Sequence, residues 1–225
     1  MKKIAILIIA LFLVTGCSVK YNVIINEDLS VSEEAKLEGT EDLYKIYYKT
    51  TKKHVLENIL NLYKATLEEN SYQYELVEDK EPYVIVNKKY DSIKDYIDNS
   101  KLFNDYFDEI KYTENKNIRR IETIGYNEND VDNPDRFVVE KLKIAITSSY
   151  IVKNHNAKDV NKNTNTYYYE LDNENDKILL EYDISKKFDP KMDLIKKITI
   201  ALIIVVIIWI AVIILTKKNK KKLII

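Results

Sequence analysis

The stretch CSVKYNVIINEDLSVSEEAKLEG, residues 17–39, decides how the chain begins to fold. Apolar residues alternate with polar ones on both sides of a turn-forming segment, residues 26–29. A period of two places alternate side chains on one face of a β-strand, so the stretch predicts a β-hairpin. The alternating apolar residues are Tyr21, Val23, Ile25, Val31, Ala35 and Leu37.

The segment before this hairpin has the layout of an export signal. Two lysines precede an apolar run over residues 4–14, and Thr15 and Gly16 follow it. The run would rise about 16 Å as a helix, roughly half of a 30 Å hydrocarbon core, so it is too short to span a membrane. We therefore interpret residues 1–16 as a signal peptide with a small-residue cleavage site.

Residues 14–17, with the sequence VTGC, resemble the lipobox of bacterial lipoproteins. That resemblance implies cleavage after Gly16 and attachment of a diacylglycerol to Cys17. The alternative is a free thiol near an ordinary cleavage site. Cys17 is the single cysteine of the chain, so no internal disulfide and no thiolate metal site is predicted.

The other end of the chain predicts a second membrane anchor. Residues 198–216 carry no charge and would rise about 28 Å as a helix, which matches a bilayer core. Lysines lie on both sides of this run, and five of them fall in residues 217–225. We therefore expect a transmembrane helix over 196–216, a basic cytoplasmic tail over 217–225, and an extracytoplasmic domain over 17–195.

The predicted domain is acidic although the whole chain is nearly neutral. All 36 acidic residues lie between the two predicted anchors, which leaves residues 17–195 with a net charge of about −10. Nucleic acid and anionic headgroups are poor partners for such a surface. Since the segment has an ordinary domain size and no internal linker, we expect one domain.

Periodicity predicts a mixture of helices and strands. Apolar residues recur at helical spacing over 52–69, and a second amphipathic helix begins after Ser92 and continues through Phe107. Strands are expected at 72–77, 83–90, 117–126, 136–154, 166–171 and 178–185, the last two joined as a hairpin by residues 172–176.

The predicted fold class is α+β, with a mainly antiparallel sheet, two amphipathic helices in the first half and one C-terminal transmembrane helix. Because both anchors would enter the same membrane, we expect the first and last strands to run in opposite directions. The start of the first strand and the end of the last would then lie at the same end of the domain.

The two ends of the chain resemble the LppM-like domain of bacterial surface lipoproteins. The similar residues are the stretch 17–39, the stretch YIVKNHNAKDVNKNTNTYYYEL at 150–171 and the apolar run 198–216. Two positions depart from that pattern: Leu29 stands where a glycine is usual, and Tyr169 where a tryptophan is usual. The resemblance implies no catalytic residue.

No pattern of catalytic or metal-binding residues emerges. His54 and His155 have no partner at metal-ligand spacing, and glycine-rich phosphate loops and GxSxG elbows are absent from the sequence. An acidic loop, residues 127–135, suggests either a calcium site or an ordinary hydrophilic loop, and it lacks the EF-hand pattern. Its acidic residues are Glu128, Asp130, Asp132 and Asp135.

Three consecutive aromatic residues, Tyr167, Tyr168 and Tyr169, indicate either binding or packing. Alternation places Tyr168 on the opposite face of its strand from Tyr167 and Tyr169. One of these faces must pack in the core. The other could line a ligand site, lie near headgroups or pack within the sheet.

The sequence therefore predicts a non-catalytic, membrane-anchored bacterial lipoprotein that binds or organises something in the cell envelope. Its expected partners are the membrane and either a hydrophobic ligand or an envelope protein, with no cofactor. Two alternatives stay open. One is an envelope hydrolase that uses paired carboxylates, and the other is an accessory subunit of a membrane complex.

Overall fold

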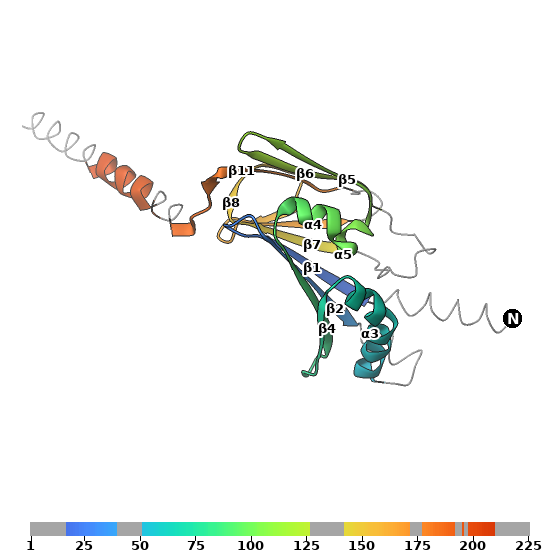
Figure 1. Cartoon of the computed structure of the whole chain (residues 1–225). Coiled ribbons are helices and arrows are strands. Elements are labelled where there is room, and N and C mark those ends of the chain that lie inside the picture. Colours follow the sequence, from blue (N-terminus) through green and yellow to red (C-terminus); the bar gives the residue numbers. More distant parts are fainter. Residues whose placement is uncertain are drawn as a thin grey trace, which may run out of the picture. The chain divides into compact units, whose positions relative to one another are not determined.

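A computed structural model describes residues 17–39, 51–126, 142–171, 177–191, 195 and 198–209 (Figure 1). The chain divides into two units, residues 1–188 and residues 189–225. The signal peptide with Gly16, the acidic loop 127–135 and the basic tail all lie outside the described residues, so the predictions made for them stay predictions.

The hairpin predicted from the opening stretch is confirmed. Strands β1, Cys17–Ile25, and β2, Val31–Gly39, pair antiparallel along their whole length. In the turn, Leu29 adopts a left-handed φ of 65°, which a glycine would adopt without strain. The carboxylate of Asp28 accepts hydrogen bonds from Ser30 N at 3.0 Å and Ser30 Oγ at 2.6 Å, and these bonds stabilise the turn.

This hairpin lies at the centre of a seven-stranded sheet with the order β3-β4-β2-β1-β7-β10-β9. β1 and β7 run parallel, whereas every other neighbouring pair is antiparallel. The remaining strands are β3 Gln73–Val77, β4 Tyr83–Tyr90, β7 Leu142–Ser148, β9 Asp159–Asn161 and β10 Thr166–Leu171.

The first predicted helix is confirmed as α3, Lys52–Glu69. Thr51 caps it, because its hydroxyl accepts a hydrogen bond from His54 N. Apolar residues at helical spacing are buried on one side, among them Leu56, which is fully buried.

The second predicted helix is wrong in its extent. Ser92 caps it as expected, but α4 ends after Ile93–Asn99, α5 covers Lys101–Asn104, and Phe107 already belongs to strand β5, Phe107–Asn115. Ser100 causes the break: its ψ of 105° ends α4, and its hydroxyl caps α5 by accepting from Phe103 N.

A second sheet contains four antiparallel strands in the order β5-β6-β11-β8. Its other strands are β6 Ile118–Tyr126, β8 Tyr150–His155 and β11 Leu179–Lys187. The long strand expected over 136–154 is broken at Ser149, where the chain passes from β7 in one sheet to β8 in the other.

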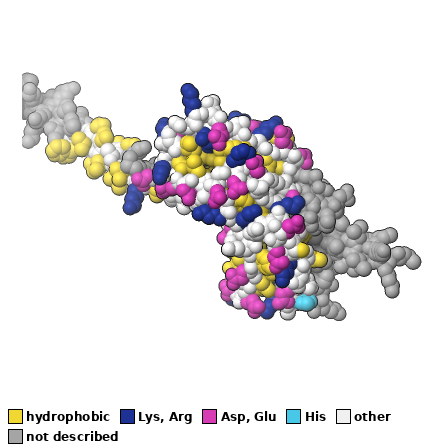
Figure 2. All heavy atoms as spheres, in the orientation of Figure 1, with side chains coloured by type: hydrophobic (Ala, Val, Ile, Leu, Met, Phe, Trp, Pro, Cys, Tyr) yellow, Lys and Arg dark blue, Asp and Glu magenta, His cyan; other side chains and the backbone are white. Residues whose placement is uncertain are grey.

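The predicted fold class is therefore contradicted in three respects. Strands form two sheets, the larger of which is mixed, and β10 and β11 belong to different sheets instead of forming a hairpin. In the part of the chain that the structure describes, no helix has the length and apolar character needed to cross a bilayer. The apolar side chains of residues 198–209 are exposed (Figure 2).

The expectation that the first strand starts where the last one ends is also wrong. Lys187, at the end of β11, forms an ion pair of 2.6 Å with Glu27, which follows the end of β1. Phe188 N donates to Ser149 O, and Ser149 N donates to Ile25 O. The start of β1 at Cys17 lies a whole strand away, about 26 Å at 3.3 Å per residue.

Aromatic side chains connect the two sheets through α4 and α5, which lie between them (Figure 1). The Phe103 ring lies 6.1 Å from the Tyr21 ring of β1 and 5.1 Å from the Phe107 ring of β5. One side of the large sheet faces this core, and its other side includes the exposed side chains of Ile24 and Tyr168.

Candidate binding face

The side of the large sheet that faces away from the core carries polar side chains in two rows. Residues that are paired in the strand register lie side by side on neighbouring strands, so each row runs across the sheet, perpendicular to the strands. We call these rows together the polar face. The first row is Gln73, Asn87, Glu34, Asn22, Ala145 and Tyr168. The second row is Lys89, Ser32, Ile24, Thr147, Thr166 and Asn161.

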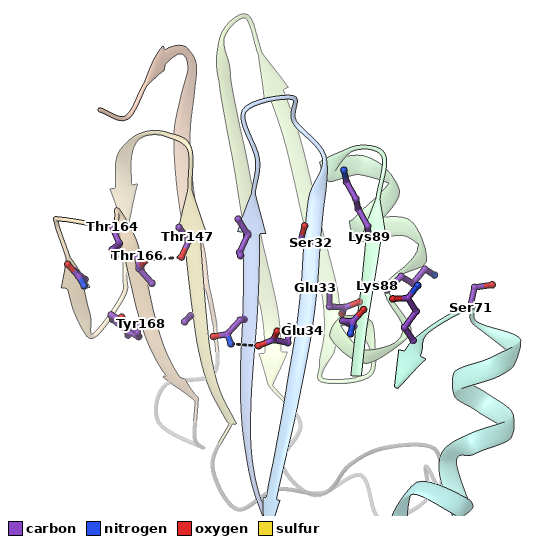
Figure 3. Close-up of a pocket in the computed structure, with 16 residues that line it drawn as sticks. Ser32, Glu33, Glu34, Ser71, Lys88, Lys89, Thr147, Thr164, Thr166 and Tyr168 are labelled. Carbon is purple, nitrogen blue, oxygen red and sulfur yellow. Dashed lines mark hydrogen bonds between the residues drawn. The ribbon is translucent and has the colours of Figure 1, made fainter. Parts of the chain in front are cut away.

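The polar face lines an open hollow of about 920 Å³. Small-molecule sites in proteins have volumes of roughly 300–1,000 Å³, so the hollow has the size of a ligand site. Figure 3 shows Tyr168 and the threonines toward one edge of it and Lys89 and Ser71 toward the other. The lining residues come from β1, β2, β3, β4, β7, β9 and β10, with Ser71 just before β3 and Thr164 between β9 and β10.

Hydrogen bonds between neighbouring strands hold several of these side chains in place. Asn22 Nδ2 donates to Glu34 Oε1 at 3.1 Å, and the hydroxyls of Thr147 and Thr166 lie 2.8 Å apart (Figure 3). The Thr164 hydroxyl lies 2.8 Å from that of Thr166. The groups are therefore positioned before any ligand arrives, which reduces the entropy lost on binding.

Two large exposed side chains with apolar surface, Tyr168 and Ile24, lie among the polar ones. Tyr168 is 41% exposed and Ile24 is 42% exposed. As predicted from alternation, Tyr168 faces away from its neighbours Tyr167 and Tyr169, which are buried. Because Ala145 is the register neighbour of Tyr168, a small side chain flanks the aromatic ring on that side.

Charges near the polar face compensate one another. The next row toward Cys17 contains Lys20 and Lys36, and both form ion pairs of 2.8 Å with Glu38. The Lys36 ammonium also lies 3.7 Å from the centre of the Tyr83 ring. Figure 2 shows basic and acidic side chains interspersed on the face of the molecule in view.

On the opposite side of β2, a buried carboxylate lies among hydroxyls. Glu33 falls between Ser32 and Glu34 in the sequence, so its side chain points into the core, where it is 1% exposed. It accepts hydrogen bonds from Tyr21 OH, from Tyr90 OH at 2.6 Å and from Ser100 Oγ at 2.5 Å.

Burial dominates the electrostatics of this cluster. It raises the pKa of Glu33 above the ordinary value of a carboxyl group, although the hydroxyls that donate to it act in the opposite direction. Burial followed by the negative charge of Glu33 raises the pKa of Tyr72 to about 12. The cluster also connects α5 to the sheet. Tyr72 OH accepts a hydrogen bond from Leu102 N of α5 at 3.2 Å and lies 3.2 Å from Tyr90 OH of β4.

The histidines singled out in the sequence are not brought together. His54 lies on α3, with Nδ1 at 3.6 Å from a carboxylate oxygen of Glu57. His155 ends β8, and its ring packs 4.8 Å from that of Tyr167. Within the described ranges, no group of three or more histidine, cysteine, aspartate or glutamate residues is arranged to hold a metal ion. Calcium binding by residues 127–135 stays a prediction, because that loop lies outside those ranges.

Cys17, the predicted site of lipid attachment, is the first residue of β1 and pairs with Gly39. The lipidated residue would therefore belong to the sheet itself, with no linker in between. Sequence reasoning did not find the polar face as a site, because its residues are spread from Asn22 to Tyr168 and each lies in an ordinary outward position of its strand.

No family model matches this chain, and no curated protein does. Among solved structures, the NMR structure of the folded domain of the Mycobacterium tuberculosis protein LppM is similar to it. The similarity covers 79% of this chain and 94% of that one, with a TM-score of 0.48 and 12% sequence identity. It concerns the fold alone; the lipidation of Cys17 stays a prediction.

Proposed function

We propose that the protein is a non-catalytic binding module of the bacterial cell envelope, attached to the outer face of the membrane by a lipid on Cys17. The polar face is its binding surface. The observation that carries the proposal is the hollow of about 920 Å³ on the side of the central sheet that faces away from the core, where side chains of many strands converge. A rigid sheet holds such groups at fixed separations, as a binding surface requires.

The position of Cys17 supports a defined orientation on the membrane. β1 begins at Cys17, and Asn22 and Ile24 of the polar face follow five and seven residues later on the same strand. At 3.3 Å per residue, these side chains lie about 17–23 Å along the strand from the lipid. A lipid on Cys17 would therefore present the hollow close above the headgroups.

The chemistry of the lining supports binding more than hydrolysis. A glycoside hydrolase needs two carboxyl groups that face a common bond, roughly 5–10 Å apart. Of the described residues around the hollow, Glu33 and Glu34 carry the carboxylates, and their side chains leave opposite faces of β2. The Glu34 carboxylate accepts a hydrogen bond from Asn22. This bond holds the carboxylate in position to accept a hydrogen bond from a ligand.

Sedimentation with insoluble envelope material tests the proposal. The full chain is mixed with envelope sacculi from which detergent has removed the lipids, and the bound fraction is measured against sacculus concentration. We expect saturable binding that the double variant Asn87→Ala/Tyr168→Ala weakens at least tenfold. Leu62→Ala, which changes an exposed residue of α3 on another surface, is the matched control and should bind like the parent chain.

Either of two results would contradict the proposal. One is the absence of saturable binding by the parent chain. The other is binding that the double variant retains in full, because the contact would then not involve the polar face. Soluble sugars or peptides released from the sacculi during the incubation would show hydrolysis instead.

A further inference from the structure

We infer that the ligand of the polar face is a neutral, hydroxyl-rich chain, an oligosaccharide that lies across the strands. The inference rests on the proposed function and adds the chemical class of the ligand. It is carried by the kinds of group in the two rows, by the exposed ring at one end of the first row and by the balance of charge.

Amides and hydroxyls supply most of the polar groups. Gln73, Asn87 and Asn22 present side-chain amides along the first row, and Thr147 and Thr166 present hydroxyls along the second. Amides and hydroxyls both donate and accept hydrogen bonds. Sugar hydroxyls do the same, so the amides of Gln73 and Asn87 can bond a sugar hydroxyl in either direction, whereas Asn22 and Thr166 already bond Glu34 and Thr147.

Tyr168 adds an apolar platform. Its ring is 41% exposed and borders the hollow, with the small side chain of Ala145 beside it in the row. One face of a pyranose ring is formed by C–H groups, which pack well against an aromatic ring, while the hydroxyls around its rim stay free for hydrogen bonds. An aromatic side chain with amides at the same level is therefore suited to a sugar unit.

The length of the rows indicates a chain instead of a single sugar. The first row crosses from β3 to β10, five strand spacings of about 4.8 Å, or roughly 24 Å. The hollow extends over most of this distance, since Gln73 and Tyr168 both line it. A monosaccharide would contact a small part of it.

The charges favour a neutral occupant. The charged residues that line the hollow are Glu33, Glu34, Lys88 and Lys89, so the two signs of charge balance. A polyanion would meet the Glu34 carboxylate in the middle of the first row, which would weaken its binding. A lipid chain would cover the amides without bonding them, and leaving buried amides unpaired is costly.

Calorimetric titration of the full chain with chitohexaose, cellohexaose and maltohexaose, each alone, tests the inference. Poly(glycerol phosphate) serves as the anionic probe. We expect at least one neutral hexasaccharide to bind, with an affinity that changes less than twofold between 0.05 and 0.5 M salt. Tyr168→Ala should weaken this binding about tenfold or more, whereas Tyr168→Phe, which keeps the ring, should change it less than threefold.

Two controls keep the result interpretable. Leu62→Ala should bind like the parent chain, and each variant must unfold at the same temperature as the parent, which shows that the fold persists. Binding of poly(glycerol phosphate) without any neutral hexasaccharide, or an affinity that Tyr168→Ala leaves unchanged, would overturn the inference. If sacculus binding still depends on the polar face, the ligand class alone is refuted; if that binding is absent as well, the proposed function is refuted.

Discussion

Replacing Glu33 with glutamine tests how the buried carboxyl group controls stability. One of its oxygens accepts from Tyr21 OH and Ser100 Oγ, and the other accepts from Tyr90 OH. At pH 4 the neutral carboxyl carries one hydrogen, whereas in Glu33→Gln the amide NH₂ carries two and cannot accept a hydrogen bond from the surrounding hydroxyls. A buried polar group left unsatisfied costs about 1–3 kcal/mol, so we expect the variant to lose about that much unfolding free energy at pH 4.

The cost should shrink as the pH rises. Burial raises the pKa of Glu33 in the folded chain above its value in the unfolded chain, which is about 4.3. The stabilisation by the neutral carboxyl is therefore fully present below the unfolded pKa and is lost as the pH rises through the folded pKa. Where the unfolded chain alone is ionised, the unfolding free energy falls by about 1.4 kcal/mol per pH unit. Glutamine has no proton to lose, so the variant lacks this component.

The assay is urea unfolding of both full chains, followed by circular dichroism at each pH from 4 to 8. The difference in unfolding free energy between parent and variant should decrease as the pH rises. Glu34→Gln, on the solvent side of the same strand, is the matched control and should show no such trend. A difference that stays constant over this range, or one that grows with pH, would refute the assignment of Glu33 as a buried acid with a raised pKa.

Other predictions concern backbone, core and lipid attachment. Gly125 has a φ of +68°, and a Cβ there would lie 2.1 Å from Asp108 Oδ2. Gly125→Ala should therefore lower the unfolding free energy by about 1–3 kcal/mol. The double variant Gly125→Ala/Asp108→Ala should regain part of that loss. Leu56→Ala removes a fully buried side chain and should lower the unfolding free energy, measured by chemical denaturation, by about 2–5 kcal/mol. Leu62 is 76% exposed, so Leu62→Ala should lower it by less than about 0.5 kcal/mol. Cys17→Ser should abolish the incorporation of radiolabelled fatty acid into the chain; retained label would refute lipidation at this residue.

Local patterns in the sequence predicted the local elements well. The hairpin of residues 17–39, α3 at Lys52–Glu69 and β4 at Tyr83–Tyr90 all agree with the structure, because each is defined by its own periodicity and its own turn or cap. The helix expected through Phe107 failed for a physical reason. Phe103 and Phe107 are four residues apart, as on one helix face, but they meet across the α5–β5 connection instead.

The arrangement of the strands could not be predicted because it depends on distant residues. The sequence does not show that β1 pairs with β7 or that Ser149 separates two sheets. The polar face was missed for the same reason, since register between distant strands assembles it. Glu33 did leave a local signal: it occupies an inward position between Val31 and Ala35, where a charged residue must find buried partners.

The parallel pairing of the central strand also determines when the protein can fold. Val19 pairs with Leu37 of the hairpin and with Leu142 of β7, far along the chain. The hairpin can form early, but its other edge stays open until about two thirds of the polypeptide has been made. Contacts so distant in sequence slow folding, and an unpaired central edge favours aggregation meanwhile. A chaperone that covers the nascent hairpin should therefore raise the yield of folded protein.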